Sequence, residues 1–183
     1  HLILVVDDNS PDGTGAIVAE FVKNNKEAIY LLTGRKQGLG RAMVRGLAYA
    51  VSKLKADVVI PNEADFAFDP KYVLPALEKI DQGYDVVVGS RHVGQGSTQG
   101  WTLNRKINHW VANTFFATWV AGIEEASDHN GAFRAVRVAG VLDQLDMRNY
   151  PTGFGFFCYW LYQLTQVTGK ICELPVTYRF RTR

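Results

Sequence analysis

The sequence contains little that would anchor, cross-link or strongly charge a protein. No run approaches the roughly 18 uninterrupted apolar residues that span a bilayer, and no charged-then-apolar leader opens the chain, so we expect a soluble, unexported domain. Its two cysteines, Cys158 and Cys172, form no C-x-x-C pair, which favours buried free thiols over a disulfide framework or a zinc site. The sequence has 20 Lys and Arg against 18 Asp and Glu, and this net charge of +2 is too small to indicate a nucleic-acid-binding protein. Any anion site must be local.

Apolar periodicity predicts one α/β domain over residues 1–183. The chain is 47% apolar and shows no repeat or linker. Short β-rich runs alternate with helix-period segments, which is typical of a mostly parallel sheet with helices on its faces. The predicted strands are 2–6, 28–32, 57–60, 85–88, 133–136 and 171–177. The predicted helices include Ile17 to Val22, capped by Asp12 or Thr14, and the ranges 43–54, 70–80, 103–119 and 154–167. Three glycines in 93–100 predict a mobile loop that could close over a ligand.

Three polar clusters follow predicted strands: Asp7-Asp8, Glu63-x-Asp65 and Ser90-Arg91. Ligands of open parallel sheets bind at the carboxyl ends of the strands, where loops and helix N-termini converge. We therefore expect the functional site at this edge of the sheet.

The carboxylates Glu63 and Asp65, with Asp69 four residues beyond, have two interpretations. Two carboxylate oxygens together with phosphate oxygens and water suit Mg²⁺ or Mn²⁺ carried by a nucleotide. Alternatively, the segment is a polar strand-to-helix loop in which Asp69 caps the helix that Pro70 opens.

The segment around Asp7-Asp8 resembles the start of two other kinds of domain, and neither fits. A receiver domain needs a phospho-accepting Asp at the end of the third strand, where this chain has Asn62. A haloacid dehalogenase needs Asp-x-Asp followed by Gly-Thr, and the spacing here fails.

The pair Gly38 and Gly40 precedes a predicted helix, whose N-terminal amides suit phosphate. A dinucleotide fingerprint would need a glycine at Met43, and a P-loop would need Gly-Lys-Ser/Thr. Two glycines that merely permit a tight turn are an equally good interpretation.

Further along, Arg105 and His109 are four residues apart and therefore share one helical face. Most surface arginines are only solvated, so an anion site would need several of them to converge.

Eight segments stand in one order along the chain: D-D-N-S-P-D-G-T at 7–14, G-L-G-x-A at 38–42, E-A-D at 63–65 with D-P at 69–70, G-S-R at 89–91, an arginine at 105, D-H-N-G-A-F-R at 128–134, E-L-P-V-T at 173–177 and an arginine at 181. Their content, order and spacing resemble the inverting family 2 glycosyltransferases with the GT-A fold, and more narrowly the dolichol-phosphate (polyprenol-phosphate) mannosyltransferases. The resemblance spans nearly the entire chain and implies a GT-A (Rossmann-like) three-layer sandwich.

The chain departs from this group's pattern at several positions. Glu63 replaces the first Asp of the D-x-D metal motif, and His109 replaces a serine of the acceptor-phosphate site. The triplet Asn130-Gly131-Ala132 stands for T-S-G, Ala67 for a Ser or Gln near the metal, and Tyr159 for a glutamate.

The resemblance implies transfer of a sugar, mannose from GDP-mannose, onto a polyprenyl phosphate at the cytoplasmic face of a membrane. It assigns the nucleotide sugar to Asp7, Asp8, Gly38, Gly40, Glu63 and Asp65 and a Mg²⁺ or Mn²⁺ ion to Glu63 and Asp65. It assigns the acceptor phosphate to Arg91, Arg105, His109 and Arg181, and catalysis to Asp65, Arg91, Arg105 and Asp128.

Two alternatives stay open from the sequence: a related enzyme using UDP-glucose or another donor, and a degenerate homologue that binds nucleotide sugar without turnover. Against the group's pattern, residues 2–6 correspond to the second strand, so we expect a catalytic domain that lacks the first strand and is truncated at both ends.

Overall fold

The computed structural model describes residues 1–99, 102–111 and 122–179, and the chain folds into two compact units. Unit 1 contains His1–Ala56 and Met147–Phe156. Unit 2 contains Asp57–Asp146 and Phe157–Arg183.

Unit 1 is built on a β-α-β-α chain path. Strand β1 (Ile3–Asp7) pairs in parallel with β2 (Ile29–Thr33), and the parallel pair is joined by helix α1 (Thr14–Asn24). Helix α2 (Leu39–Ser52) follows and packs against β1. The predicted strands and helices of this unit are confirmed, but α1 is capped by Gly13 rather than by a side chain; Asp12 instead bonds the amide and hydroxyl of Thr14. The short 3₁₀ helix η4 (Met147–Asn149) lies in the same unit.

Unit 2 contains a four-stranded sheet in the order β3-β6-β4-β7. Its strands are β3 (Val58–Val59), β4 (Val86–Ser90), β6 (Arg134–Arg137) and β7 (Ile171–Pro175). Since β6 is antiparallel to both β3 and β4, and β4 is parallel to β7, three of the four strands run in one direction. The predicted strand at 57–60 is shorter than expected, and the strand at 133–136 is the reversed one.

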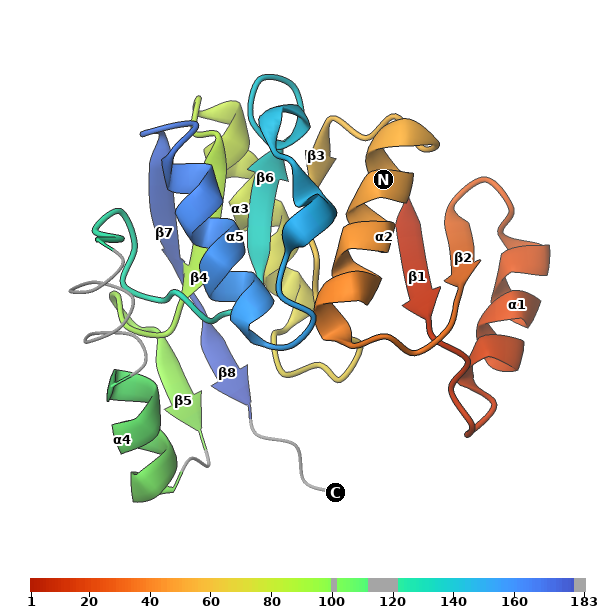
Figure 1. The fold of residues 1–183 in the computed structure, drawn as a ribbon, viewed down its shortest axis with the longest axis horizontal. Helices are drawn as coiled ribbons and strands as arrows, with labels where there is room; N and C mark the ends of the chain where they lie inside the picture. The colour runs from red at the N-terminus through yellow and green to blue at the C-terminus, as the bar shows by residue number, and fades with distance from the viewer. Residues whose placement is uncertain (100–101, 112–121, 180–183) are drawn as a thin grey trace. The chain divides into compact units, whose positions relative to one another are not determined.

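The helices of unit 2 lie on both faces of this sheet. Figure 1 shows α5 (Gly155–Thr165), which enters unit 2 at Phe157, on one face and α3 (Val73–Asp81) on the other. The 3₁₀ helix η1 (Pro70–Tyr72) leads into α3, and Asp69 caps it by accepting from the amide of Lys71 at 2.9 Å. Helix α4 (Leu103–Trp110) covers part of the predicted helix 103–119, of which 112–119 lies outside the described residues; η3 (Leu142–Gln144) follows β6. The core includes fully buried Val86, Val87, Val88, Phe133 and Trp160.

Two sequence predictions are wrong at the end of β7. The predicted strand 171–177 is broken at Val176 into β7 and β8 (Thr177–Arg179). Pro175 has no amide to continue the ladder, and Val176 turns its amide to the carbonyl of Ser90 at 2.9 Å. Strand β8 then pairs in parallel with β5 (Ser97–Gln99), so the segment predicted as a mobile loop contains a strand.

The cysteine prediction is confirmed in part. Both thiols are free, but each is half-buried rather than buried. Burial raises the pKa of both Cys158 and Cys172, which favours the protonated, unreactive thiol.

Candidate functional site

Hydrogen bonds link the end of β4 to β7 through a loop residue, Ser127. The amide and hydroxyl of Ser127 donate to Glu173 Oε1 at 2.9 and 2.7 Å. Its hydroxyl also lies 3.1 Å from the hydroxyl of Ser90, which accepts from the amide of His92 at 3.2 Å. The G-S-R and E-L-P-V-T segments are therefore tied together, and the residues after Ser90 and Ser127 are held side by side.

Those following residues, Arg91 and Asp128, form a buried bidentate ion pair. The Arg91 Nε and Nη2 donate to Asp128 Oδ2 and Oδ1, both at 2.6 Å, and the Arg91 amide donates to Oδ2 at 3.0 Å. Arg91 is 8% exposed and Asp128 is 0% exposed. Burial by itself would raise the pKa of Asp128, but the hydrogen bonds and charge of Arg91 outweigh it and hold that pKa below its usual value.

Two aromatic rings flank the Arg91 guanidinium. Its central carbon lies 6.0 Å from the Phe68 ring centroid and 5.7 Å from that of Tyr178, and the two rings meet edge to face. Cation–π contacts of this kind stabilise a desolvated guanidinium. The position of Arg91 is thus set by a carboxylate and by rings from two other segments.

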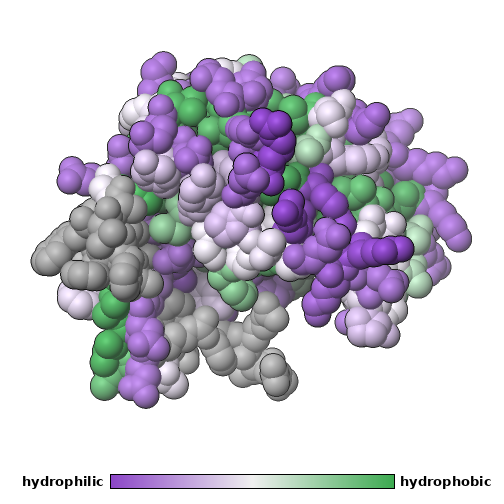
Figure 2. All heavy atoms as spheres, viewed as in Figure 1, coloured by the Kyte–Doolittle hydropathy of each residue, from purple (hydrophilic) through white to green (hydrophobic). Residues whose placement is uncertain are grey.

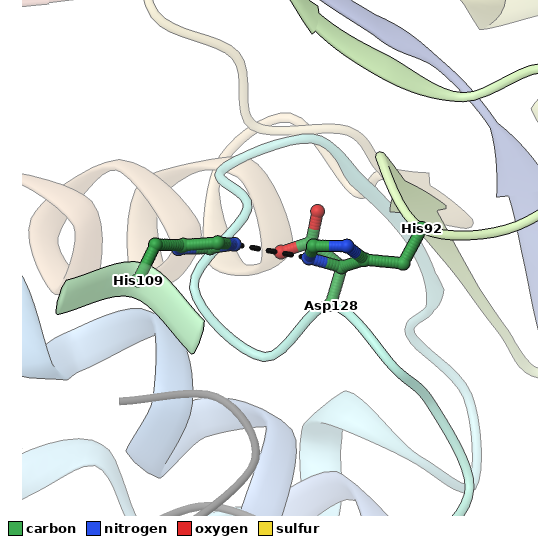
Figure 3. A group of neighbouring side chains, drawn as sticks. All are labelled: His92, His109 and Asp128. Carbon is green, nitrogen blue, oxygen red and sulfur yellow. Dashed lines mark hydrogen bonds between the residues drawn. The ribbon is translucent and has the colours of Figure 1, made fainter. Parts of the chain in front are cut away.

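Beside this pair, two histidines meet over Asp128 (Figure 3). His92 Nε2 and His109 Nε2 are 3.0 Å apart, so one ring donates and the other accepts. Their nitrogens and an Asp128 carboxylate oxygen all lie within 4.8 Å of one another. His92 is exposed, His109 is half-buried and Asp128 is buried, so the group opens to solvent on the His92 side.

Arg134 holds the loop that carries Asp128 through hydrogen bonds to backbone carbonyls. This fully buried arginine donates to the carbonyls of His129 and Phe157 and faces the Trp160 ring. Burial lowers the pKa of Arg134 to about 10, so it remains charged at neutral pH. Burial likewise lowers the pKa of His129, whose Nε2 bonds the carbonyl of Ile123. His129 is therefore a neutral, structural histidine.

The predicted metal residues Glu63 and Asp65 lie on the loop that follows β3, and both are half-buried. Asp65 Oδ1 accepts from the Ala67 amide at 2.9 Å, and Asn62 accepts from the Glu63 amide at 3.0 Å, which shapes a tight turn. Phe66, with φ of 57°, forms the exposed tip of this turn.

In unit 1, the two predicted nucleotide aspartates are both engaged by protein groups. Asp7 is buried and accepts from the hydroxyl of Ser10 at 2.5 Å. Asp8 pairs with Arg45 Nη2 at 2.5 Å, at side-chain exposures of 18% and 31%.

Gly38 and Gly40 face residues 151 and 152 of the same unit. The Gly40 amide donates to the Thr152 carbonyl at 2.7 Å. A Cβ at Gly40 would lie 1.9 Å from the Pro151 carbonyl oxygen, and Gly38 has φ of 96°. Both positions therefore require glycine for local packing, whether or not a nucleotide binds beside them.

The structure brings three of the predicted site residues, Arg91, Asp128 and His109, together. Arg105 lies on α4 one turn before His109, and Arg181 lies outside the described residues. Sequence reasoning missed His92 and Ser127. No spacing signal marks them, because their partners are 17 and 46 residues away and meet them only in the folded sheet.

Comparisons with known proteins identify the family of the chain. Residues 2–143 match the sequence model of Glycosyl transferase family 2. The chain is 29% identical over 181 residues to the polyprenol monophosphomannose synthase of Mycolicibacterium smegmatis, spanning 98% of this chain and 67% of that protein. It is 30% identical over 177 residues to the undecaprenyl-phosphate mannosyltransferase of Micrococcus luteus, spanning 96% of this chain and 71% of that protein.

The solved structures show the fold. The glucosyl-3-phosphoglycerate synthase of Mycobacterium tuberculosis, in complex with Mn²⁺, UDP-glucose and glycerol 3-phosphate, superposes with a TM-score of 0.62 at 17% identity, over 98% of this chain. A complex of that enzyme with phosphoglyceric acid gives a TM-score of 0.64 at 16% identity. The chain spans 61% of the length of these proteins. The α/β architecture is therefore that of a GT-A glycosyltransferase, and the chain belongs to glycosyl transferase family 2.

Proposed function

We propose that this chain transfers mannose from GDP-mannose to a polyprenyl phosphate with inversion at the anomeric carbon. One observation carries the proposal: two relatives that match 96% or more of the chain at about 30% identity are both named for mannose and a polyprenyl phosphate. The acceptor phosphate attacks the anomeric carbon in line with the departing nucleoside diphosphate.

The acceptor chemistry places few demands on the protein. A phosphate monoester has a second pKa of about 6, so the attacking oxygen is already largely ionised at neutral pH. No general base is then required, which fits the presence of Tyr159 where the group has a glutamate. The protein needs to orient the phosphate and compensate charge.

In our proposal, the acceptor phosphate is oriented and its charge compensated by Arg91, Arg105, His109 and Arg181. Asp128 and the flanking rings fix the Arg91 guanidinium before substrate arrives, and His109 lies across the same carboxylate. Such preorganisation means that little reorientation is needed when the phosphate binds. In this proposal Asp128 is therefore a positioning residue.

The donor end is assigned to Asp7, Asp8, Gly38 and Gly40 for the nucleotide and to Glu63 and Asp65 for a divalent cation. Carboxylate oxygens are hard donors that suit Mg²⁺ or Mn²⁺. When bound, the ion supplies positive charge beside the departing diphosphate. The turn around Asp65 holds both carboxylates on one short loop, which supports this assignment.

A lipid acceptor also requires contact with a membrane surface. Helix α4 exposes three apolar side chains on one face: Leu103, Ile107 and Trp110 are 71%, 50% and 62% exposed. Figure 2 shows this apolar surface over α4 at the lower left of the view. In the described part of the chain, none of the helices has the length and hydropathy needed to traverse a bilayer. We propose that α4 lies on the cytoplasmic face of a membrane and presents His109 to the phosphate.

The proposal is tested by incubating the protein with polyprenyl phosphate and radiolabelled GDP-mannose or UDP-glucose, each with Mn²⁺, Mg²⁺ or chelator. We expect lipid-linked label from GDP-mannose that chelator abolishes. Label from UDP-glucose alone would replace the donor assignment, and no label from any donor would favour the degenerate homologue.

Two variants separate the ends of the site. Asp65→Asn should abolish metal-dependent transfer, with exposed Asp143→Asn as its matched control. Arg105→Ala should raise KM for the lipid phosphate and leave nucleotide binding nearly intact; equal losses in both would contradict that division.

A further inference from the structure

We propose that His92, His109 and Asp128 form a binding site for one divalent transition-metal ion such as Zn²⁺, Co²⁺ or Ni²⁺. The site differs in ligand type from the carboxylate pair Glu63 and Asp65, which suits Mg²⁺ or Mn²⁺. It rests on the geometry of these three side chains and does not depend on the transfer reaction.

The ligand set selects the class of ion. Two imidazole nitrogens are borderline donors, and together with one carboxylate oxygen they bind Zn²⁺, Co²⁺ and Ni²⁺ well and Mg²⁺ poorly. Three protein ligands also leave an open coordination position, which is characteristic of sites where a water or substrate oxygen completes the shell. The ion would therefore be held by protein on one side and by solvent on the other.

The distances fit a compact site. Metal–nitrogen bonds of about 2.1 Å place two nitrogens about 3.4 Å apart at the tetrahedral angle and about 3.0 Å apart at the roughly 90° angle of an octahedral ion. His92 Nε2 and His109 Nε2 are separated by 3.0 Å, and the carboxylate of Asp128 completes a group within 4.8 Å. Figure 3 shows the two rings directed at each other through these nitrogens, with the carboxylate beside them. An ion would replace the shared proton, and each ring would tilt to direct its lone pair at the ion.

The surroundings permit this exchange. His92 is exposed, so an ion can reach the group from solvent. Asp128 is fixed by Arg91 through three hydrogen bonds, which orients the carboxylate as outer-shell partners commonly do for metal ligands. The guanidinium charge weakens the attraction for a cation, so we expect a reversible site rather than a structural one.

The experiment is a titration of the metal-free chain with Co²⁺, followed by visible absorption, and with Zn²⁺, followed by calorimetry. Neither nucleotide nor lipid is added, so the result is independent of mannose transfer. His1 is the matched control, because it is an exposed histidine outside the group whose imidazole could bind a metal by itself. We expect His1→Ala to bind one Co²⁺ as the parent does.

In the His1→Ala background, His92→Ala and His109→Ala should each lower Co²⁺ affinity by on the order of tenfold to 100-fold, since even outer-shell changes have effects of this size. Neither ring belongs to the buried core, and circular dichroism checks that both variants fold. Glu63→Gln should leave the Co²⁺ affinity unchanged. The proposal is overturned if His1→Ala removes binding, or if the two histidine variants bind Co²⁺ as tightly as their background.

Discussion

Replacing Asp128 by Asn tests whether the buried ion pair holds the site together. The substitution keeps the size of the side chain and removes its charge. In the parent protein, Asp128 compensates Arg91 with three hydrogen bonds at 2.6, 2.6 and 3.0 Å. An asparagine offers one acceptor oxygen, and its NH₂ group would face a guanidinium nitrogen that also donates. Arg91 would then be a buried cation without a counter-charge.

The expected cost follows from that burial. Because Asp128 and Arg91 are 0% and 8% exposed, solvent does little to screen the loss. Removing one partner of a buried pair typically costs about 3–5 kcal/mol. We expect a decrease of that size in the free energy of unfolding of unit 2, to which both residues belong. It would be a large share of the about 5–15 kcal/mol that stabilises an ordinary domain.

Urea unfolding followed by tryptophan fluorescence measures this loss, because Trp160 is fully buried in the same unit. Asp143→Asn is the matched control; Asp143 is exposed, and the same chemical change there should stay within about 0.5 kcal/mol. A double variant, Asp128→Leu with Arg91→Met, should recover part of the stability since it leaves no unpaired charge. An Asp128→Asn loss no larger than that of the control would refute the reasoning.

The remaining predictions concern pH, packing and thiols. The folded-state pKa of Asp128 lies below its ordinary 3.8, so its contribution to stability is complete above that pH and is lost as the pH falls through the folded pKa. In urea titrations, the difference in the free energy of unfolding between the parent and Asp128→Asn should therefore be constant from about pH 5 to 8 and shrink below about pH 4. Gly40→Ala should destabilise by about 1–3 kcal/mol in the same assay, because its Cβ would overlap backbone, whereas Gly153→Ala, with open space around it, should not. Cys158 and Cys172 should react with a disulfide reagent at pH 8 more slowly than the thiol of an unfolded cysteine peptide, because burial raises both pKa values; urea should remove this difference in rate.

The parts of the fold that could be predicted are those that local pattern determines. The apolar run before Asp7 became β1, which pairs with β2 and is only partly buried, and the run before Gly89 became β4, which is buried along its length between β6 and β7. The cap at Asp69 was also readable, since Asp followed by Pro is a strong helix start. Among the candidate site residues, Arg91, His109 and Asp128 were assigned through resemblance to a family, and the structure places them next to one another.

The parts that could not be predicted depend on which distant segment a strand meets. The sequence pattern of residues 171–177 predicts one continuous strand. In the structure β7 pairs with β4 and β8 pairs with β5, and the change of partner occurs at Val176, whose amide donates to the Ser90 carbonyl. Strand β5 could not be predicted from the glycine-rich composition of 93–100 either, because it forms by pairing with the distant β8. Propensity describes a residue's own conformational preference, and partner choice is a tertiary property.

The same distinction changes the interpretation of Arg91. From the sequence it was one of several arginines that could meet a phosphate, and each was an independent candidate. In the structure, its Nε and Nη2 are committed to a carboxylate 37 residues away, and its neighbour Ser90 contacts Ser127, the neighbour of that carboxylate. The G-S-R segment and the segment that begins at Asp128 therefore act as one unit, in which a charge change at either residue displaces the other. An arginine held this way contributes a fixed electrostatic field at the site, and a ligand would approach from the solvent side, where His92 is exposed.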